Sequence, residues 1–89
     1  MSKLDDARNK INQIDEAMLK LFEERMHAVQ MVAEYKLENQ LPVLDASREQ
    51  NIIEKNVSLL NNKDLEDYYR IFFEGVLKSS KEYQKDLMK

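Results

Sequence analysis

The segment KLDDARNKINQIDEAMLKLFEERMHAVQMVAEYKLE, residues 3–38, decides the fold. It contains neither glycine nor proline and is rich in residues that favour helices. Its apolar residues recur at helical spacing, at Leu4, Ile11, Ile14, Met18, Leu21, Phe22, Val29 and Val32. Ser2 can cap the start, and Pro42 stops the pattern at the other end. The segment therefore predicts one helix from about Lys3 to about Glu38.

This helix is too long for a compact chain of 89 residues. At about 1.5 Å per residue it would measure about 54 Å, whereas a compact domain of this size has a radius of gyration of about 12 Å. Two shorter helices cannot cover its apolar stripe from end to end, so a second copy of the chain is the simplest cover. The alternative is a break near Glu23–His27, which would give a monomeric bundle, although that stretch holds no Gly or Pro. We expect an intertwined helical homodimer.

Two shorter helices follow the long one. The second helix is expected to start at Asp45 or Ser47, both good caps, and to run to about Leu60. The sequence NNKD at 61–64 predicts a turn, and apolar residues at helical spacing predict a third helix over 65–87. The expected fold is all-α, with three helices per chain.

Composition narrows the class of protein. One Gly, one Pro and 35% charged residues disfavour β-rich architectures, and the length predicts a single domain over residues 1–89. The chain has no cysteine, and its single histidine, His27, argues against a histidine-based metal site. A net charge of −3 disfavours nucleic acid as a partner, and the charged start MSKLDDARNK predicts neither a signal peptide nor a membrane span. We therefore expect a soluble, cytoplasmic protein without a metal.

Two cations occupy the middle of the apolar stripe on the long helix. On a helical wheel, Arg25 and Lys36 fall within about 40° of Ile14 and Val32. Arg8 lies at the edge of the same stripe. A buried cation without a partner costs several kcal/mol, so these positions require anions.

The other two helices carry polar residues in similar places. Ser80 and Gln84 continue the apolar line of the third helix, and Asp45, Arg48 and Glu49 share one side of the second helix. One alternative is that Arg25 and Lys36 pair with Glu49 and Asp45, or extend outward to water.

Two carboxylates are nevertheless too few to neutralise Arg8, Arg25, Lys36 and Arg48 together. The surplus positive charge predicts a small anionic ligand with two carboxylates. The sequence shows no nucleophile–base pair, metal-ligand set or glycine-rich phosphate loop, so any chemistry must need none of them.

The order and spacing of these polar residues resemble the all-helical class of chorismate mutases. Arg8, Arg25 and Lys36 are followed by DASRE at 45–49 and SKEYQ at 80–84, and the surrounding segments RNKINQID, LFEERM, VAEYK and PVLDASRE are also similar to that family. The resemblance covers essentially the whole chain. It implies an intertwined dimer in which the long helices pair and each active site draws on both chains.

The resemblance also implies the site and the reaction. The site of one protomer would be lined by Arg25, Lys36, Asp45, Arg48, Glu49, Ser80 and Gln84, with Arg8 donated by the partner. The reaction would be the Claisen rearrangement of chorismate to prephenate, on the way to phenylalanine and tyrosine. It is unimolecular and pericyclic, so no cofactor is expected.

Roles follow from the resemblance and from the chemistry of the side chains. Arg8 and Arg25 would clamp the two carboxylates of the substrate. Lys36 and Gln84 would donate to the ether oxygen, which gains negative charge as its C–O bond breaks. Glu49 would accept from the substrate hydroxyl.

The remaining site residues would support these five. Asp45 would assist Glu49, Arg48 would orient the acidic residues, and Ser80 would support one carboxylate of the substrate. The sequence shows no second catalytic or regulatory domain, so feedback control is not expected.

Two rival functions remain open at this point. An isochorismate pyruvate lyase has similar cations on its first helix but lacks the D-x-x-R-E arrangement that is intact here at Asp45, Arg48 and Glu49. A non-catalytic helical dimerisation module would explain the long helix. It would not explain Lys36, Ser80 and Gln84 on buried faces.

Overall fold

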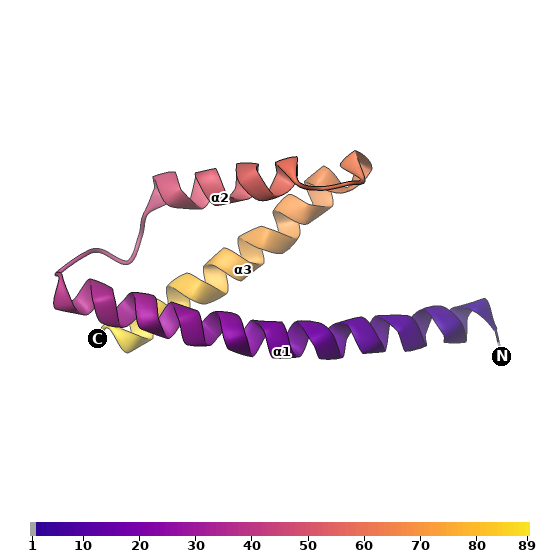
Figure 1. The fold of residues 1–89 in the computed structure, drawn as a ribbon, viewed down its shortest axis with the longest axis horizontal. Coiled ribbons are helices and arrows are strands. Elements are labelled where there is room, and N and C mark those ends of the chain that lie inside the picture. The colour runs from indigo at the N-terminus through magenta and orange to yellow at the C-terminus, as the bar shows by residue number, and fades with distance from the viewer. Residues whose placement is uncertain (1) are drawn as a thin grey trace.

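The computed structural model describes residues 2–89. Its elements are α1 (Lys3–Glu38), α2 (Ala46–Ser58), a short 3-10 helix η1 (Lys63–Leu65) and α3 (Glu66–Leu87), and the described residues contain no strand. The expected all-α fold with one long and two shorter helices is confirmed (Figure 1). Met1, the first residue of the expected domain, lies outside the described residues.

Local interactions fix both ends of α1. The side chain of Ser2 accepts a hydrogen bond from the backbone N–H of Asp5 at 3.1 Å, which satisfies one free donor of the first turn. At the other end Gln40 adopts a left-handed conformation with φ 54°, and the N–H of Leu41 donates to the carbonyl of Lys36 at 2.8 Å. This is a Schellman motif, which closes a helix when the residue after the cap turns left-handed. The expected bounds of α1 are confirmed, and the alternative break near Glu23–His27 is wrong.

The second helix starts where its cap predicts. The carboxylate of Asp45 accepts from the backbone N–H of Arg48 at 3.1 Å. The helix ends at Ser58, two residues before the expected end, because Leu59 and Leu60 turn the chain toward η1. The carbonyl oxygen of the Asn62 side chain then caps η1 by accepting from the N–H of Asp64 at 3.0 Å.

Helix α3 packs against both of the other helices. The backbones of α1 and α2 do not approach each other (Figure 1). The apolar core along α3 is small and consists of Val29, Ala33, Val57, Phe73 and Leu77. Polar residues of α1 and α3, and of α2 with its N-cap, meet where the three helices surround a common space.

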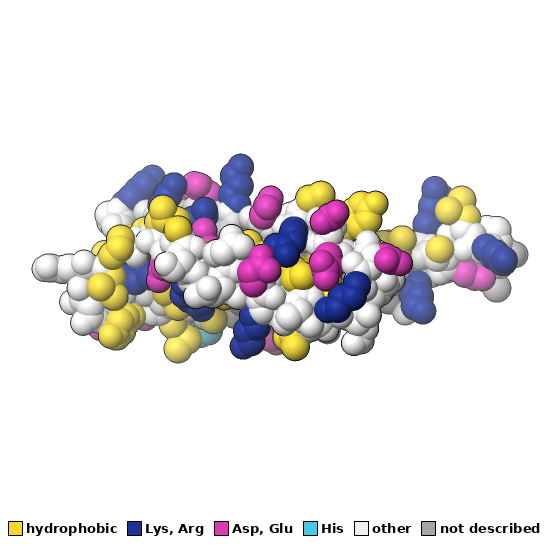
Figure 2. Space-filling view, turned by 90° about the horizontal axis from the view of Figure 1, so that it is seen from above, with side chains coloured by type: hydrophobic (Ala, Val, Ile, Leu, Met, Phe, Trp, Pro, Cys, Tyr) yellow, Lys and Arg dark blue, Asp and Glu magenta, His cyan; other side chains and the backbone are white. Residues whose placement is uncertain are grey.

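The N-terminal half of α1 extends beyond the rest of the chain (Figures 1 and 2). The chain measures 56 × 25 × 15 Å and its radius of gyration is 16.3 Å, well above the value of about 12 Å for a compact domain of this size. Large apolar side chains on this half stay 41–61% exposed, namely those of Leu4, Ile11, Ile14, Met18, Leu19, Leu21 and Phe22. The single chain therefore leaves much of its apolar stripe exposed. No helix among the described residues is long and apolar enough to cross a membrane.

Candidate active site

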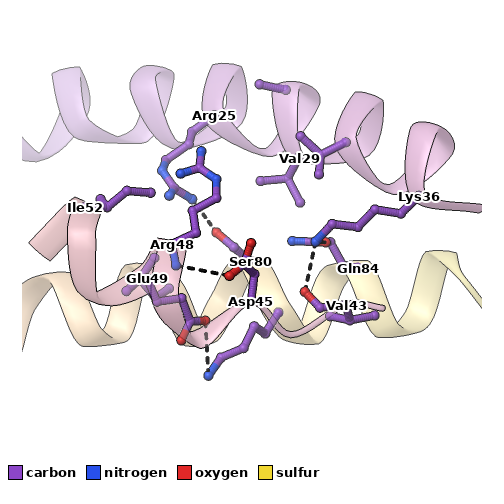
Figure 3. Close-up of a pocket in the computed structure, with 14 residues that line it drawn as sticks. Arg25, Val29, Lys36, Val43, Asp45, Arg48, Glu49, Ile52, Ser80 and Gln84 are labelled. Atoms are coloured by element: carbon purple, nitrogen blue, oxygen red, sulfur yellow. Dashed lines mark hydrogen bonds and ion pairs between the residues drawn. The ribbon is translucent and has the colours of Figure 1, made fainter. Parts of the chain in front are cut away.

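A cavity of about 310 Å³ lies between α1 and α2, with α3 as its floor (Figure 3). Its volume falls at the lower end of the range for small-molecule sites, about 300–1,000 Å³. Seven of the eight predicted site residues line it: Arg25, Lys36, Asp45, Arg48, Glu49, Ser80 and Gln84. Apolar side chains from the three helices, among them Val29, Ile52 and Leu77, form the rest of the wall. The structure thus brings residues from three separate segments to one hollow.

Arg25 occupies one end of the cavity. Its Nη1 donates to the hydroxyl of Ser80, and its guanidinium lies over the ring of Phe73, 5.8 Å from the centroid. Burial lowers the pKa of Arg25, and the nearby positive charge of Arg48 lowers that pKa further. Two like charges therefore face each other in a partly dry site, an arrangement that an anion would stabilise.

Ser80 is buried and has both of its hydrogen-bonding functions occupied. Its hydroxyl donates to the carbonyl of Val76 at 3.0 Å and accepts from Arg25. This geometry orients the guanidinium of Arg25 within the cavity.

Lys36 and Gln84 occupy the other end of the cavity (Figure 3). Nζ of Lys36 donates to the carbonyl of Val43 at 2.9 Å and to Oε1 of Gln84 at 2.8 Å. Gln84 is only 8% exposed, although its side chain is polar. Both acceptors are neutral, so they position the lysine without cancelling its charge.

The two carboxylates of the cavity wall, those of Asp45 and Glu49, interact with groups other than Arg25 and Lys36. Asp45 caps its own helix, and Glu49 forms an ion pair with Lys81 of α3, with Nζ and Oε1 3.4 Å apart. Lys81 also lines the cavity but was missed from the sequence. Its spacing could have revealed it, since it lies four residues after Leu77 and three before Gln84, on one side of α3.

The charges of the cavity do not balance within the chain. In the part of the chain that the structure describes, Arg25, Lys36 and Arg48 form no ion pair with a carboxylate. The alternative in which Arg25 and Lys36 pair with Glu49 and Asp45 is therefore wrong. The cavity wall holds four cationic and two acidic side chains, which leaves an excess of two positive charges. This excess matches a ligand that carries two carboxylates.

Arg8 is the predicted site residue that the fold does not bring to the cavity. It lies 17 positions before Arg25 on the same uninterrupted helix, about 25 Å away along the axis. Its side chain is exposed on the projecting half of α1. Arg8 therefore cannot reach the cavity within the single chain. Among residues 2–89, no cluster of three or more His, Cys, Asp or Glu side chains could hold a metal ion.

A family model and a curated relative match the chain over most of its length. The family model of chorismate mutase type II matches residues 7–85. The bifunctional chorismate mutase/prephenate dehydratase of Buchnera aphidicola subsp. Acyrthosiphon pisum (strain APS) is 32% identical over 83 residues, which is 92% of this chain and 22% of the relative. The chain thus spans about a fifth of the length of that curated relative. No solved structure matches the chain significantly. The extent of the family match shows that the chain belongs to the chorismate mutase type II family.

Proposed function

We propose that the protein is a chorismate mutase, an isomerase that converts chorismate to prephenate in the biosynthesis of phenylalanine and tyrosine. Membership of the family supports this activity. The proposal depends on one observation: among residues 2–89, Arg25, Lys36 and Arg48 form no ion pair with a carboxylate, and all three line one small cavity. Chorismate is a dianion of fitting charge.

The reaction makes modest demands on the protein. One C–O bond of the substrate breaks while one C–C bond forms within the same molecule, so no nucleophile, proton transfer or cofactor is required. The enzyme must hold the flexible side chain of the substrate over its ring, and must stabilise the negative charge that gathers on the ether oxygen. A rigid cavity with fixed donors meets both demands.

The donors at the Lys36 end would stabilise the ether oxygen. Lys36 donates two of its three N–H groups to Val43 and Gln84, and the third remains for a ligand. Gln84 accepts from Lys36 through Oε1, so its amide nitrogen is left to donate. Both groups would lie against the oxygen of the breaking bond.

The guanidinium groups at the other end would bind carboxylates. Arg25 is oriented by Ser80, and Arg48 lies beside it, so the two planar donor sets can hold an anion between them. Ser80 would act on the substrate carboxylate through Arg25, since its own proton is donated to Val76. Glu49 would accept from the substrate hydroxyl, with Asp45 at the start of the same helix nearby.

We further propose that the active enzyme is a homodimer in which Arg8 of one protomer completes the site of its partner. The exposed stripe on the N-terminal half of α1 needs a cover, and Arg8 lies at the edge of that stripe about 25 Å from its own cavity. A second copy of α1 would cover the stripe and bring an additional cation to the ligand.

The decisive test follows the loss of chorismate absorbance with purified protein and identifies the product. Formation of prephenate supports the proposal. Release of pyruvate and salicylate from isochorismate, without prephenate from chorismate, would assign the chain to lyases instead. A folded dimer that turns over neither compound would leave a dimerisation module.

A further inference from the structure

The ion pair between Lys81 and Glu49 joins α3 to α2 at the wall of the cavity. The side chains of Lys81 and Glu49 are 33% and 25% exposed. In each of the other three ion pairs within residues 2–89, both side chains are more exposed. The roles proposed above use Glu49 as the acceptor for the substrate hydroxyl and assign no role to Lys81, although it lines the same cavity.

We propose that Lys81 is a positioning residue for the reaction, which fixes the carboxylate of Glu49 in the orientation that receives the substrate hydroxyl. This inference rests on the proposed function. Lys81 approaches Oε1 of Glu49 at 3.4 Å, so Oε2 is left for the ligand. A glutamate has several rotatable bonds, and a fixed cation on the neighbouring helix restricts its range.

Charge gives a second reason for this pairing. A carboxylate beside a site for a dianion repels the ligand, and this repulsion is strong where water is partly excluded. Lys81 cancels the charge of Glu49 while leaving an oxygen free to accept a hydrogen bond. In the described part of the chain, no other cation forms an ion pair with Glu49. Arg48, the cation next to it on α2, lies close to Arg25 instead.

The side chain of Lys81 can be altered without disturbing the core, because it is partly exposed. Lys81→Met keeps the length of the stem and removes the charge. We expect kcat to fall at least ~10-fold, because a small displacement of a positioning group has a large effect on rate. A lysine that only attracted the dianion would change KM and leave kcat as it was. Lys81→Arg should restore most of the loss.

The matched control is Lys85→Met, which removes a lysine from an exposed ion pair with Glu82 on the same helix. It should retain wild-type kcat and KM. Circular dichroism and the oligomeric state of each variant are compared with those of the wild type.

A double-mutant cycle identifies the group through which Lys81 acts. In a Glu49→Gln background, Lys81→Met should change kcat by less than about twofold, since the carboxylate that it positions is gone. An equal loss in both backgrounds would overturn the positioning role, because Lys81 would then contact the ligand itself. Unchanged kcat in Lys81→Met, with an active wild type, would also overturn it and leave the proposed function intact. A wild-type protein that fails to convert chorismate would instead overturn the proposed function, and the role of Lys81 with it.

Discussion

Nζ of Lys36 donates to Oε1 of Gln84 at 2.8 Å, and this contact fixes which end of the amide faces the cavity. Because the oxygen is engaged, the amide nitrogen keeps its hydrogens for another acceptor. A second bond, from Lys36 to the carbonyl of Val43 at 2.9 Å, holds the ammonium group in place. The pair is therefore organised before any ligand arrives, which is the condition for effective stabilisation of a transition state.

The loss of Lys36 tests this arrangement directly. Lys36→Ala should lower kcat at least ~10²-fold, the scale for removal of one donor to a developing negative charge. Chorismate absorbance at saturating substrate provides the measurement. Lys78→Ala, an exposed lysine of α3 outside the cavity, serves as the control and should be fully active. Wild-type turnover by Lys36→Ala would eliminate the proposed role.

Gln84→Glu should make the activity depend on pH. Glutamine donates at every pH, whereas a glutamate at this buried position can donate only when it is protonated. We expect the variant to be weak near about pH 8 and to recover toward about pH 5, as the carboxyl group gains its proton. The measurement is kcat across this range for the variant and the wild type. A variant whose profile follows that of the wild type would mean that residue 84 does not donate to the substrate.

The faces of the helices could be predicted from the sequence, because helical periodicity places each side chain around its own axis. This periodicity placed Arg25, Lys36, Ser80 and Gln84 on the apolar faces of their helices, and the structure brings all four to one cavity. N-terminal caps explain why the starts of α1 and α2 were predicted accurately, with Ser2 before α1 and Asp45 before α2.

Contacts between helices could not be predicted from the sequence in this way. The Lys81–Glu49 pair depends on how far α2 is shifted along α3, and no single-helix pattern contains that distance. The left-handed Gln40 was missed because glycine and asparagine are the usual residues at such a position. The homodimer remains a prediction.

Mixing two inactive variants tests the proposal that each site is shared between two chains. Arg8→Ala and Arg25→Ala should each lose activity, because each removes one of the two proposed clamps for a substrate carboxylate. After subunit exchange at equal amounts, half of the dimers are mixed and each mixed dimer regains one intact site. The expected recovery is about a quarter of wild-type activity. No recovery, with exchange verified by mass spectrometry or a tagged subunit, would show that Arg8 does not serve the partner's site.

Gln40→Gly should stabilise the protein without changing its catalysis. A left-handed backbone is unfavourable for a residue with a Cβ atom, and glycine removes that cost at the price of extra freedom in the unfolded chain. The expected net gain is about 0.5 kcal/mol, measured by chemical unfolding at one protein concentration. Gln40→Ala keeps the Cβ atom and should show no gain. A less stable Gln40→Gly variant would contradict the strain inferred at this turn.

The ion pair between Arg70 and Glu54 should make stability depend on pH. Arg70 donates to Oε1 of Glu54 at 2.8 Å and to Oε2 at 3.3 Å, joining α3 to α2. The hydrogen bond from Arg70 lowers the pKa of Glu54 below its ordinary value of 4.5. A carboxylate whose pKa is lower in the folded state stabilises the fold above the unfolded pKa, and the contribution disappears as pH falls through the folded pKa.

Glu54→Gln should therefore lower Tm at neutral pH, by a small amount because the pair is exposed. The difference from the wild type should shrink below about pH 4.5 and vanish once Glu54 is protonated in the folded protein. Thermal unfolding at fixed protein concentration across this range measures it. Glu74→Gln alters an exposed glutamate of α3 that forms no ion pair within residues 2–89, and it should leave Tm unchanged throughout. A Tm difference for Glu54→Gln that persists unchanged in acid would show that the carboxylate's charge is not what stabilises the contact between α2 and α3.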